Sequence, residues 1–144
     1  MTMTAVVTVY VGMALTEAPP EFRDGFQQEL KSGLRMLPGV TVLDFVGLEG
    51  GTALDVYRHD RGSTLQADLA IFICDHPSTG MGMEIMVRHY SRRPTLLFAA
   101  TGSRVTRMVL GFSEAEQVPL HRYGSVQEIV ASVQRWVEDA RLTV

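Results

Sequence analysis

The sequence predicts a single-domain α/β protein built on a doubly wound, five-stranded parallel sheet of the flavodoxin-like or Rossmann-like kind. Five short apolar runs alternate with helical patterns along the chain, and this alternation is typical of parallel strands joined by right-handed crossovers. The chain has 144 residues, of which 46% are hydrophobic and 20% are charged. This length and composition are ordinary for one globular domain. We therefore expect one domain over residues 1–144.

The five predicted strands are short apolar runs. They cover residues 5–11, 40–46, 68–73, 95–99 and 118–121. The first run is rich in valine and reads as a strand that is apolar and buried on both faces. Ligands of such sheets bind at the carboxyl edge of the strands, near the point where the strand order reverses. The site is therefore expected in the loops 12–16, 75–82 and 101–104.

The predicted helices alternate with these strands. They occupy residues 19–37, 52–65, the stretch from the end of the 77–82 loop to about 91, 103–110 and 125–142. In the first helix, apolar side chains recur every three or four residues, which is the stripe of an amphipathic helix. Gly25 and Gly33 interrupt that helix, and each costs up to about 1 kcal/mol against alanine. We expect close packing or a local irregularity there.

Charge and apolar content argue against two classes of partner. The chain carries 13 basic and 16 acidic residues, a formal charge of −3. No basic run stands out, so nucleic acid is not an expected partner. The apolar runs are well short of the roughly 20 residues of a spanning helix, and no signal-like segment is found, so no membrane role is expected. The single cysteine, Cys74, allows no internal disulfide and favours a cytoplasmic, reducing compartment.

Several familiar chemistries lack their motifs. The loop that begins at Gly12 contains neither the GxGxxG pattern of dinucleotide binding nor the GxxxxGK[ST] pattern of a phosphate loop. It also lacks the acidic cluster of a receiver domain and the hydroxyl-rich phosphate loop of a flavodoxin. The four histidines fall in different segments without zinc-ligand spacing. We read them as surface or hydrogen-bonded residues and expect no cofactor, no metal and a small-molecule ligand.

Two acids are predicted to approach the same edge of the sheet. Asp60 lies in the second helix, and Glu84 follows the glycine-containing loop 77–82. We place Glu84 in the first turn of the third helix, where backbone N–H groups favour the ionised carboxylate. An ionised carboxylate can act as a nucleophile. The alternative is that Glu84 only complements the helix dipole and that Asp60 lies on a solvated helix face.

This region resembles a known family. An acid eight residues before the strand start at Asp68 is followed by the loop Pro77-Ser78-Thr79-Gly80-Met81-Gly82-Met83-Glu84. The pattern resembles the nucleoside 2-deoxyribosyltransferase superfamily and, within it, the 2'-deoxynucleoside 5'-phosphate N-hydrolases. Weaker likenesses at residues 9–11, 103–105 and 108–111 extend the resemblance over nearly the whole chain.

The resemblance implies roles for individual residues. Glu84 would be the nucleophile on the anomeric carbon, Asp60 the acid that assists departure of the base, and Tyr10 the group that orients Glu84. On the sequence alone, Tyr10 is equally well a half-buried strand aromatic. Asp68 also matches the family, but its place at the start of a buried strand favours a structural cap.

The resemblance also implies a set of substrate-binding residues. They are Gly12, Ser78, Gly80, Gly82 and Thr106. Ser78 stands where the transferases carry an acid that faces the sugar 5'-hydroxyl, whereas the phosphate-accepting hydrolases have serine there. Thr106 matches a hydroxyl that in those hydrolases reaches a neighbouring subunit's phosphate site. The arginine that the hydrolases carry after the first strand is missing, and Arg23 or Arg104 could substitute for it.

These observations predict an N-glycosidase that hydrolyses a (deoxy)nucleoside 5'-monophosphate to free base and sugar phosphate. Ser78 favours a phosphorylated substrate because an acid in its place would repel the phosphate. The alternatives are a nucleoside deoxyribosyltransferase, a catalytically silent nucleotide-binding module, and a glycosidase of a larger nucleotide such as NAD. A homodimer is expected from Thr106 and from the methionines at 81, 83, 86 and 108, unless these are ordinary core methionines.

Overall fold

The computed structural model describes residues 5–16, 18–43 and 48–142 of the chain. These residues form a five-stranded, all-parallel sheet in the order β2-β1-β3-β4-β5. The strands are β1 (Val7–Met13), β2 (Val40–Val42), β3 (Leu69–Ile73), β4 (Thr95–Ala100) and β5 (Leu120–Tyr123). This is the flavodoxin-like strand order, so the predicted fold class is confirmed.

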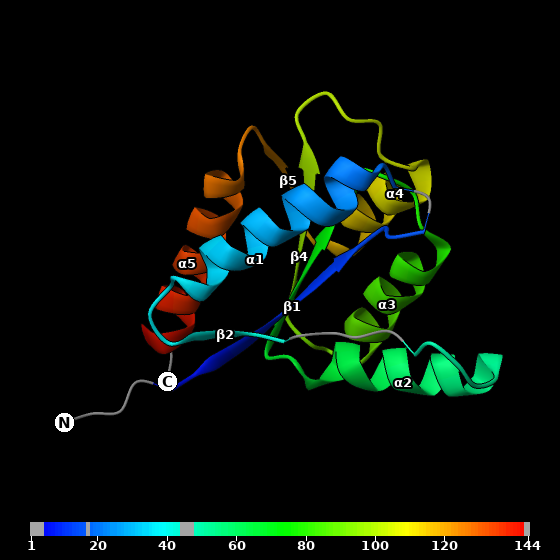
Figure 1. Cartoon of the computed structure of the whole chain (residues 1–144). Coiled ribbons are helices and arrows are strands. Elements are labelled where there is room, and N and C mark those ends of the chain that lie inside the picture. Colours follow the sequence, from blue (N-terminus) through cyan, green and yellow to red (C-terminus); the bar gives the residue numbers. More distant parts are fainter. Residues whose placement is uncertain (1–4, 17, 44–47, 143–144) are drawn as a thin grey trace.

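Helices cover both faces of the sheet (Figure 1). They are η1 (Glu21–Phe26), α1 (Gln27–Arg35), α2 (Ala53–Gln66), α3 (Thr79–Tyr90), α4 (Arg107–Glu116) and α5 (Val126–Leu142). Side chains of β1 alternate between two cores: Val9 and Val11 pack with α1 and α5, whereas Tyr10 packs with Met81 and Ile85 of α3. Tyr10 therefore points to the face that carries α3. No helix in the described ranges is long and apolar enough to cross a bilayer.

Several boundaries differ from the sequence prediction. Helix α4 begins at Arg107 and not at Ser103, because Ser103 closes a turn on the Ala100 carbonyl with both its N–H and its hydroxyl. Strand β5 begins at Leu120 and not at Val118, because Val118 is bonded to Ser113 at the end of α4. The predicted strand residues 45 and 46 lie outside the described residues.

The two glycines of the first predicted helix accompany the features that were expected, a local irregularity and close packing. Gly25 lies in η1, a stretch of π-helix that runs directly into α1. Gly33 faces α5 at close range, and a Cβ atom built on it would lie 2.9 Å from Cγ2 of Val130. The first glycine thus accompanies an irregularity, and the second permits close packing of α1 on α5.

A buried cation fixes α3 against the sheet. The Arg88 side chain is fully buried and donates hydrogen bonds to the carbonyl oxygens of Thr64 (3.1 Å), Ala67 (2.7 Å), Asp68 (3.4 Å) and Pro94. These carbonyls belong to the end of α2 and to the segments that enter β3 and β4. Burial lowers the pKa of Arg88 to about 10, which leaves the group charged at neutral pH. Arg88 therefore holds α2, α3 and two strands in one arrangement.

Candidate active site

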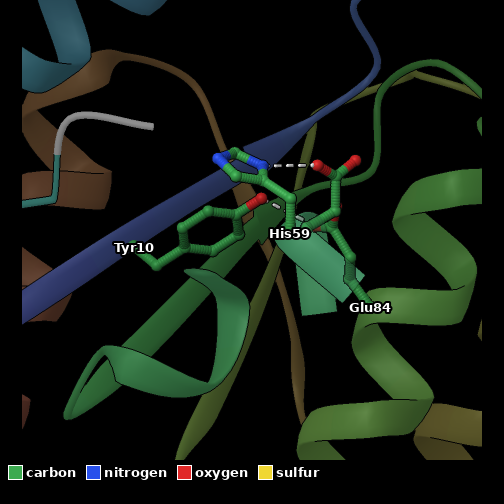
Figure 2. Close-up of polar contacts among 4 residues, drawn as sticks. Tyr10, His59 and Glu84 are labelled. Carbon is green, nitrogen blue, oxygen red and sulfur yellow. Dashed lines mark hydrogen bonds and ion pairs between the residues drawn. The ribbon is translucent and has the colours of Figure 1, made fainter. Parts of the chain in front are cut away.

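Tyr10 and Glu84 meet beneath the carboxyl edge of the sheet. The Tyr10 hydroxyl donates a hydrogen bond of 2.8 Å to Oε2 of Glu84, as Figure 2 shows. Tyr10 is only 3% exposed, and its ring packs edge-on against Phe72. The core thus fixes the direction in which the hydroxyl points. The predicted proximity of Tyr10 and Glu84 is present in the structure.

The predicted environment of Glu84 is wrong. Ser78 caps α3 by accepting the Met81 N–H on its hydroxyl oxygen at 3.2 Å, so the helix already begins at Thr79. Glu84 consequently lies in the second turn, away from the free N–H groups of the first turn. Burial raises the pKa of Glu84, and the nearby Asp60 acts in the same direction. The hydrogen bond from Tyr10 opposes both effects and favours the ionised carboxylate.

Asp60 approaches from α2, a helix that starts at a capping box between Thr52 and Asp55. The Asp60 side chain is one-third exposed, and its Oδ1 lies 3.1 Å from Nδ1 of His59 (Figure 2). With the proton on Nδ1, His59 donates to Asp60. Asp60 thus has a hydrogen-bond partner and an open side. Together with Glu84 it lines two cavities, one of about 290 Å³ and one of about 210 Å³.

Two adjoining cavities meet at this site. A cavity of about 290 Å³ is lined by both acids, by Tyr10 and by residues of α1. A larger cavity of about 600 Å³ is lined by the amino end of α3 and the start of α4. The two share Thr16, Ser78, Gly80 and Met81. One elongated ligand can therefore reach from the N–H groups of α3 to the pair of acids.

Four of the five predicted substrate-binding residues line the larger cavity. They are Ser78, Gly80, Gly82 and Thr106. Gly12 does not line either of the two cavities: a Cβ atom there would collide with the ring of Phe72. Its small size serves packing in the β1 and β3 region. The predicted loop 101–104 is also displaced from both cavities, because Thr101 is bonded through its N–H and hydroxyl to the Tyr123 carbonyl.

Some residues reach the smaller cavity only through the packing of α1, which the sequence motifs do not predict. Gln27 and Lys31 of α1 line the smaller cavity, and Lys31 is the only lysine of the chain. Of the two arginines suggested as phosphate ligands, neither lines the two cavities, and Arg23 pairs with Asp24 at 3.4 Å. Thr64, one turn after Asp60, could have been found from its spacing, since residues four apart share a helix face.

Other polar residues have structural partners. Asp68 accepts the Thr8 N–H at 2.9 Å, so the predicted cap at the start of β3 is confirmed. The Cys74 thiol is buried, and burial with the nearby Asp75 raises its pKa to about 12, which removes its value as a nucleophile. The described ranges contain no group of three or more histidine, cysteine or acidic side chains that could hold a metal ion.

Comparison with known proteins gives likenesses of fold. No protein-family model and no curated protein sequence matches the chain. The structure of the CMP N-glycosidase BcmB from Clostridium botulinum has a TM-score of 0.66 and 17% identity, over 90% of this chain and 98% of that one. A 2-desoxiribosyltransferase from Leishmania mexicana has a TM-score of 0.53 and 15% identity, over 83% and 81%. The chain has the fold of both enzymes.

A conserved protein from Enterococcus faecalis V583 is similar as well, with a TM-score of 0.60 and 11% identity, over 91% of this chain and 99% of that one. At such identities the likeness extends to the fold and not to the substrate. The fold that the sequence resemblance implied is thus present, and the chemistry depends on the side chains of the site.

Proposed function

We propose that this protein is an N-glycosidase that hydrolyses a nucleoside 5'-monophosphate to free base and sugar phosphate. The observation that carries the proposal is the Tyr10–Glu84 hydrogen bond at a cavity that Asp60 also lines. Two carboxyl groups and an orienting hydroxyl are what cleavage through an oxocarbenium-like state requires. The N-glycosidase and deoxyribosyltransferase with the same fold support the proposal.

In the first step, a carboxylate oxygen of Glu84 attacks the anomeric carbon. The bond from that carbon to the base nitrogen breaks, and its electron pair leaves with the base, which takes a proton from the carboxyl group of Asp60. Tyr10 holds Oε2 of Glu84 and leaves the other oxygen for attack. The product of this step is a glycosyl ester on Glu84.

In the second step, water opens the ester. The carboxylate of Asp60 takes one proton from the water, the water oxygen bonds to the anomeric carbon, and Glu84 leaves as a carboxylate. The pair is thereby returned to its starting protonation. If a second base replaced the water, the same site would transfer the sugar, which is the alternative deoxyribosyltransferase reaction.

The phosphate fits the larger cavity. The N–H groups of Thr79 and Gly80 belong to the first turn of α3 and have no carbonyl four residues back within the helix. The Ser78 oxygen already accepts the Met81 N–H, so its own hydrogen is free to be donated. Backbone N–H groups at a helix start and a serine hydroxyl together suit a phosphate.

A homodimer is proposed with the site. A groove of about 750 Å³ between α3 and α4 is mainly apolar and is lined by Met83 and Met108, which are 54% and 82% exposed. Met81, in contrast, is an ordinary core residue. Thr106, at the start of α4, would then lie beside a neighbouring subunit. A monomeric mass at micromolar concentration with full activity would contradict the shared site.

The test is base release from matched nucleosides, their 5'-monophosphates and NAD, followed by chromatography of the free base. We expect the monophosphates to be the best substrates, preferred over the nucleosides by about tenfold to a hundredfold because of charge-assisted hydrogen bonds to the phosphate. Ser78→Asp should lose that preference. Release that appears only after a second base is added would identify a transferase. Binding without any release would identify the silent module.

A further inference from the structure

The Thr64 hydroxyl is buried and lacks a well-formed hydrogen bond within the part of the chain that the structure describes. The residue is 0% exposed, and its Oγ1 makes no hydrogen bond to the described residues. A threonine inside a helix commonly bonds the carbonyl four residues back, and Thr64 does not. An unsatisfied buried hydroxyl destabilises a fold, so its retention needs a reason.

The position of Thr64 suggests that reason. Thr64 and Asp60 lie one turn apart on α2 and line the same cavity of about 210 Å³ with Glu84. Arg88 holds the Thr64 carbonyl at 3.1 Å and so fixes this turn of α2. The hydroxyl is close enough to Tyr10 and Glu84 to favour the ionised form of each, so it lowers the pKa of both groups.

We propose that Thr64 is a positioning residue whose hydroxyl donates to the phenolic oxygen of Tyr10, which in turn donates to Glu84. This inference rests on the proposed function, in which Glu84 is the nucleophile. The Tyr10 oxygen gives its hydrogen to Glu84 and keeps lone pairs that can accept. Hydrogen bonds in series strengthen one another, and those of catalytic groups commonly tighten when substrate binds. The relay therefore aligns Glu84 and favours its ionised form.

The test that needs no substrate is titration of the Glu84 carboxyl by carbon-13 NMR. Thr64→Val keeps the shape and removes the hydroxyl, and Thr64→Ser keeps the hydroxyl. We expect the valine variant to raise the pKa of Glu84 by about half a unit to one unit and the serine variant to restore it. Ser63→Ala, which removes a hydroxyl from the adjacent position of α2, is the control and should leave the pKa unchanged.

A double-mutant cycle with Tyr10→Phe separates a relay from a merely structural role. If Thr64 acts through Tyr10, Thr64→Val adds little to Tyr10→Phe in the pKa of Glu84 and in the acid limb of kcat/KM. Additive effects, or an unchanged pKa in folded Thr64→Val, would overturn the proposal. Thr64→Ala serves if the valine variant does not fold. Absence of base release by the native protein would refute the proposed function. The titration would still show whether Thr64 acts on Glu84 through Tyr10.

Discussion

Glu84 and Arg88 lie one turn apart on α3, and their ionisable side chains differ in how many hydrogen-bond partners the fold provides. Arg88 is fully buried and donates to four backbone carbonyls. Glu84 is half-buried, accepts a hydrogen bond from Tyr10 and lines a cavity with a second acid. Both groups lose hydration, but Arg88 receives four carbonyl partners on its two terminal nitrogens, and only its Nε has none among the described residues.

The difference indicates that Arg88 stabilises the fold and that Glu84, on the same helix, is available for chemistry. A buried charge that is held by several hydrogen bonds rigidifies its surroundings, whereas one with few partners and a raised pKa is suited to react. Arg88 lies one turn after Glu84 on α3 and holds the end of α2, one turn after Asp60. The partly satisfied acid thus depends on the well-satisfied cation for its position.

Removing the acid should have the largest effect. Glu84→Gln should reduce base release about a thousandfold or more while it keeps the fold and ligand binding, because the amide is no nucleophile. The same variant should be more stable than the native protein at pH 7. The raised pKa means that the folded state holds the Glu84 proton more tightly than the unfolded state does, so the ionised form costs stability above the unfolded pKa of about 4.3.

This stability difference should shrink as the pH falls from the raised pKa of the folded state to the unfolded value and be largely lost below it, which urea unfolding at pH 7 and pH 4 would measure. Near-normal turnover by Glu84→Gln would contradict the mechanism. Failure of the folded variant to bind any ligand would instead make Glu84 a structural residue.

Removing the cation should damage stability first. Arg88→Met keeps the volume but removes the donor of four buried or partly buried carbonyls, of which Pro94 keeps the Ala70 N–H, so the free energy of unfolding should fall by about 3 kcal/mol or more. Arg88→Lys retains the charge without the planar fork of donors and should recover only part of the loss. Unchanged urea midpoints in both variants would contradict the structural role of Arg88.

Tyr10→Phe should have an intermediate effect, on rate and on pH dependence. Loss of one hydrogen bond to a charged group corresponds to a decrease of about tenfold to a hundredfold in kcat. Tyr10 lowers the pKa of Glu84, so its removal raises that pKa and shifts the acid limb of kcat/KM to higher pH. A decrease in rate without this shift would mean that Tyr10 acts on the substrate and not on Glu84.

Gly80→Ala should have the smallest effect. A Cβ atom at Gly80 meets nothing within 4 Å, and the position borders both cavities. Alanine should therefore stabilise α3 by about 0.5–1 kcal/mol and raise KM by occupying ligand space. Gly62→Ala on α2 also meets nothing within 4 Å and is the matched control, with the same gain in stability. Equal KM values in both variants would mean that Gly80 does not contact the ligand.

The sequence was informative where periodicity or a motif decides the outcome. The end of β3 at Ile73 and the approach of Asp60 and Glu84 to one edge of the sheet were predictable, because strand ends of a parallel sheet converge. The contact of Tyr10 with Glu84 was implied only by the family resemblance. The environment of Glu84 was not, because the glycines suggested a loop although Ser78 already caps the helix. Lys31 was missed as well, since its approach to the cavity depends on how α1 crosses β1.

The most direct test of the central claim is to trap the sugar on Glu84. A 2'-deoxy-2'-fluoro nucleoside 5'-monophosphate slows both steps by destabilising the oxocarbenium-like state, so a covalent intermediate can accumulate. Mass spectrometry of the intact protein and of its peptides should then find one added fluoro-sugar phosphate, located on Glu84 and missing in Glu84→Gln. Base release from native protein with no adduct, or an adduct on another residue, would contradict the role of Glu84 as the nucleophile.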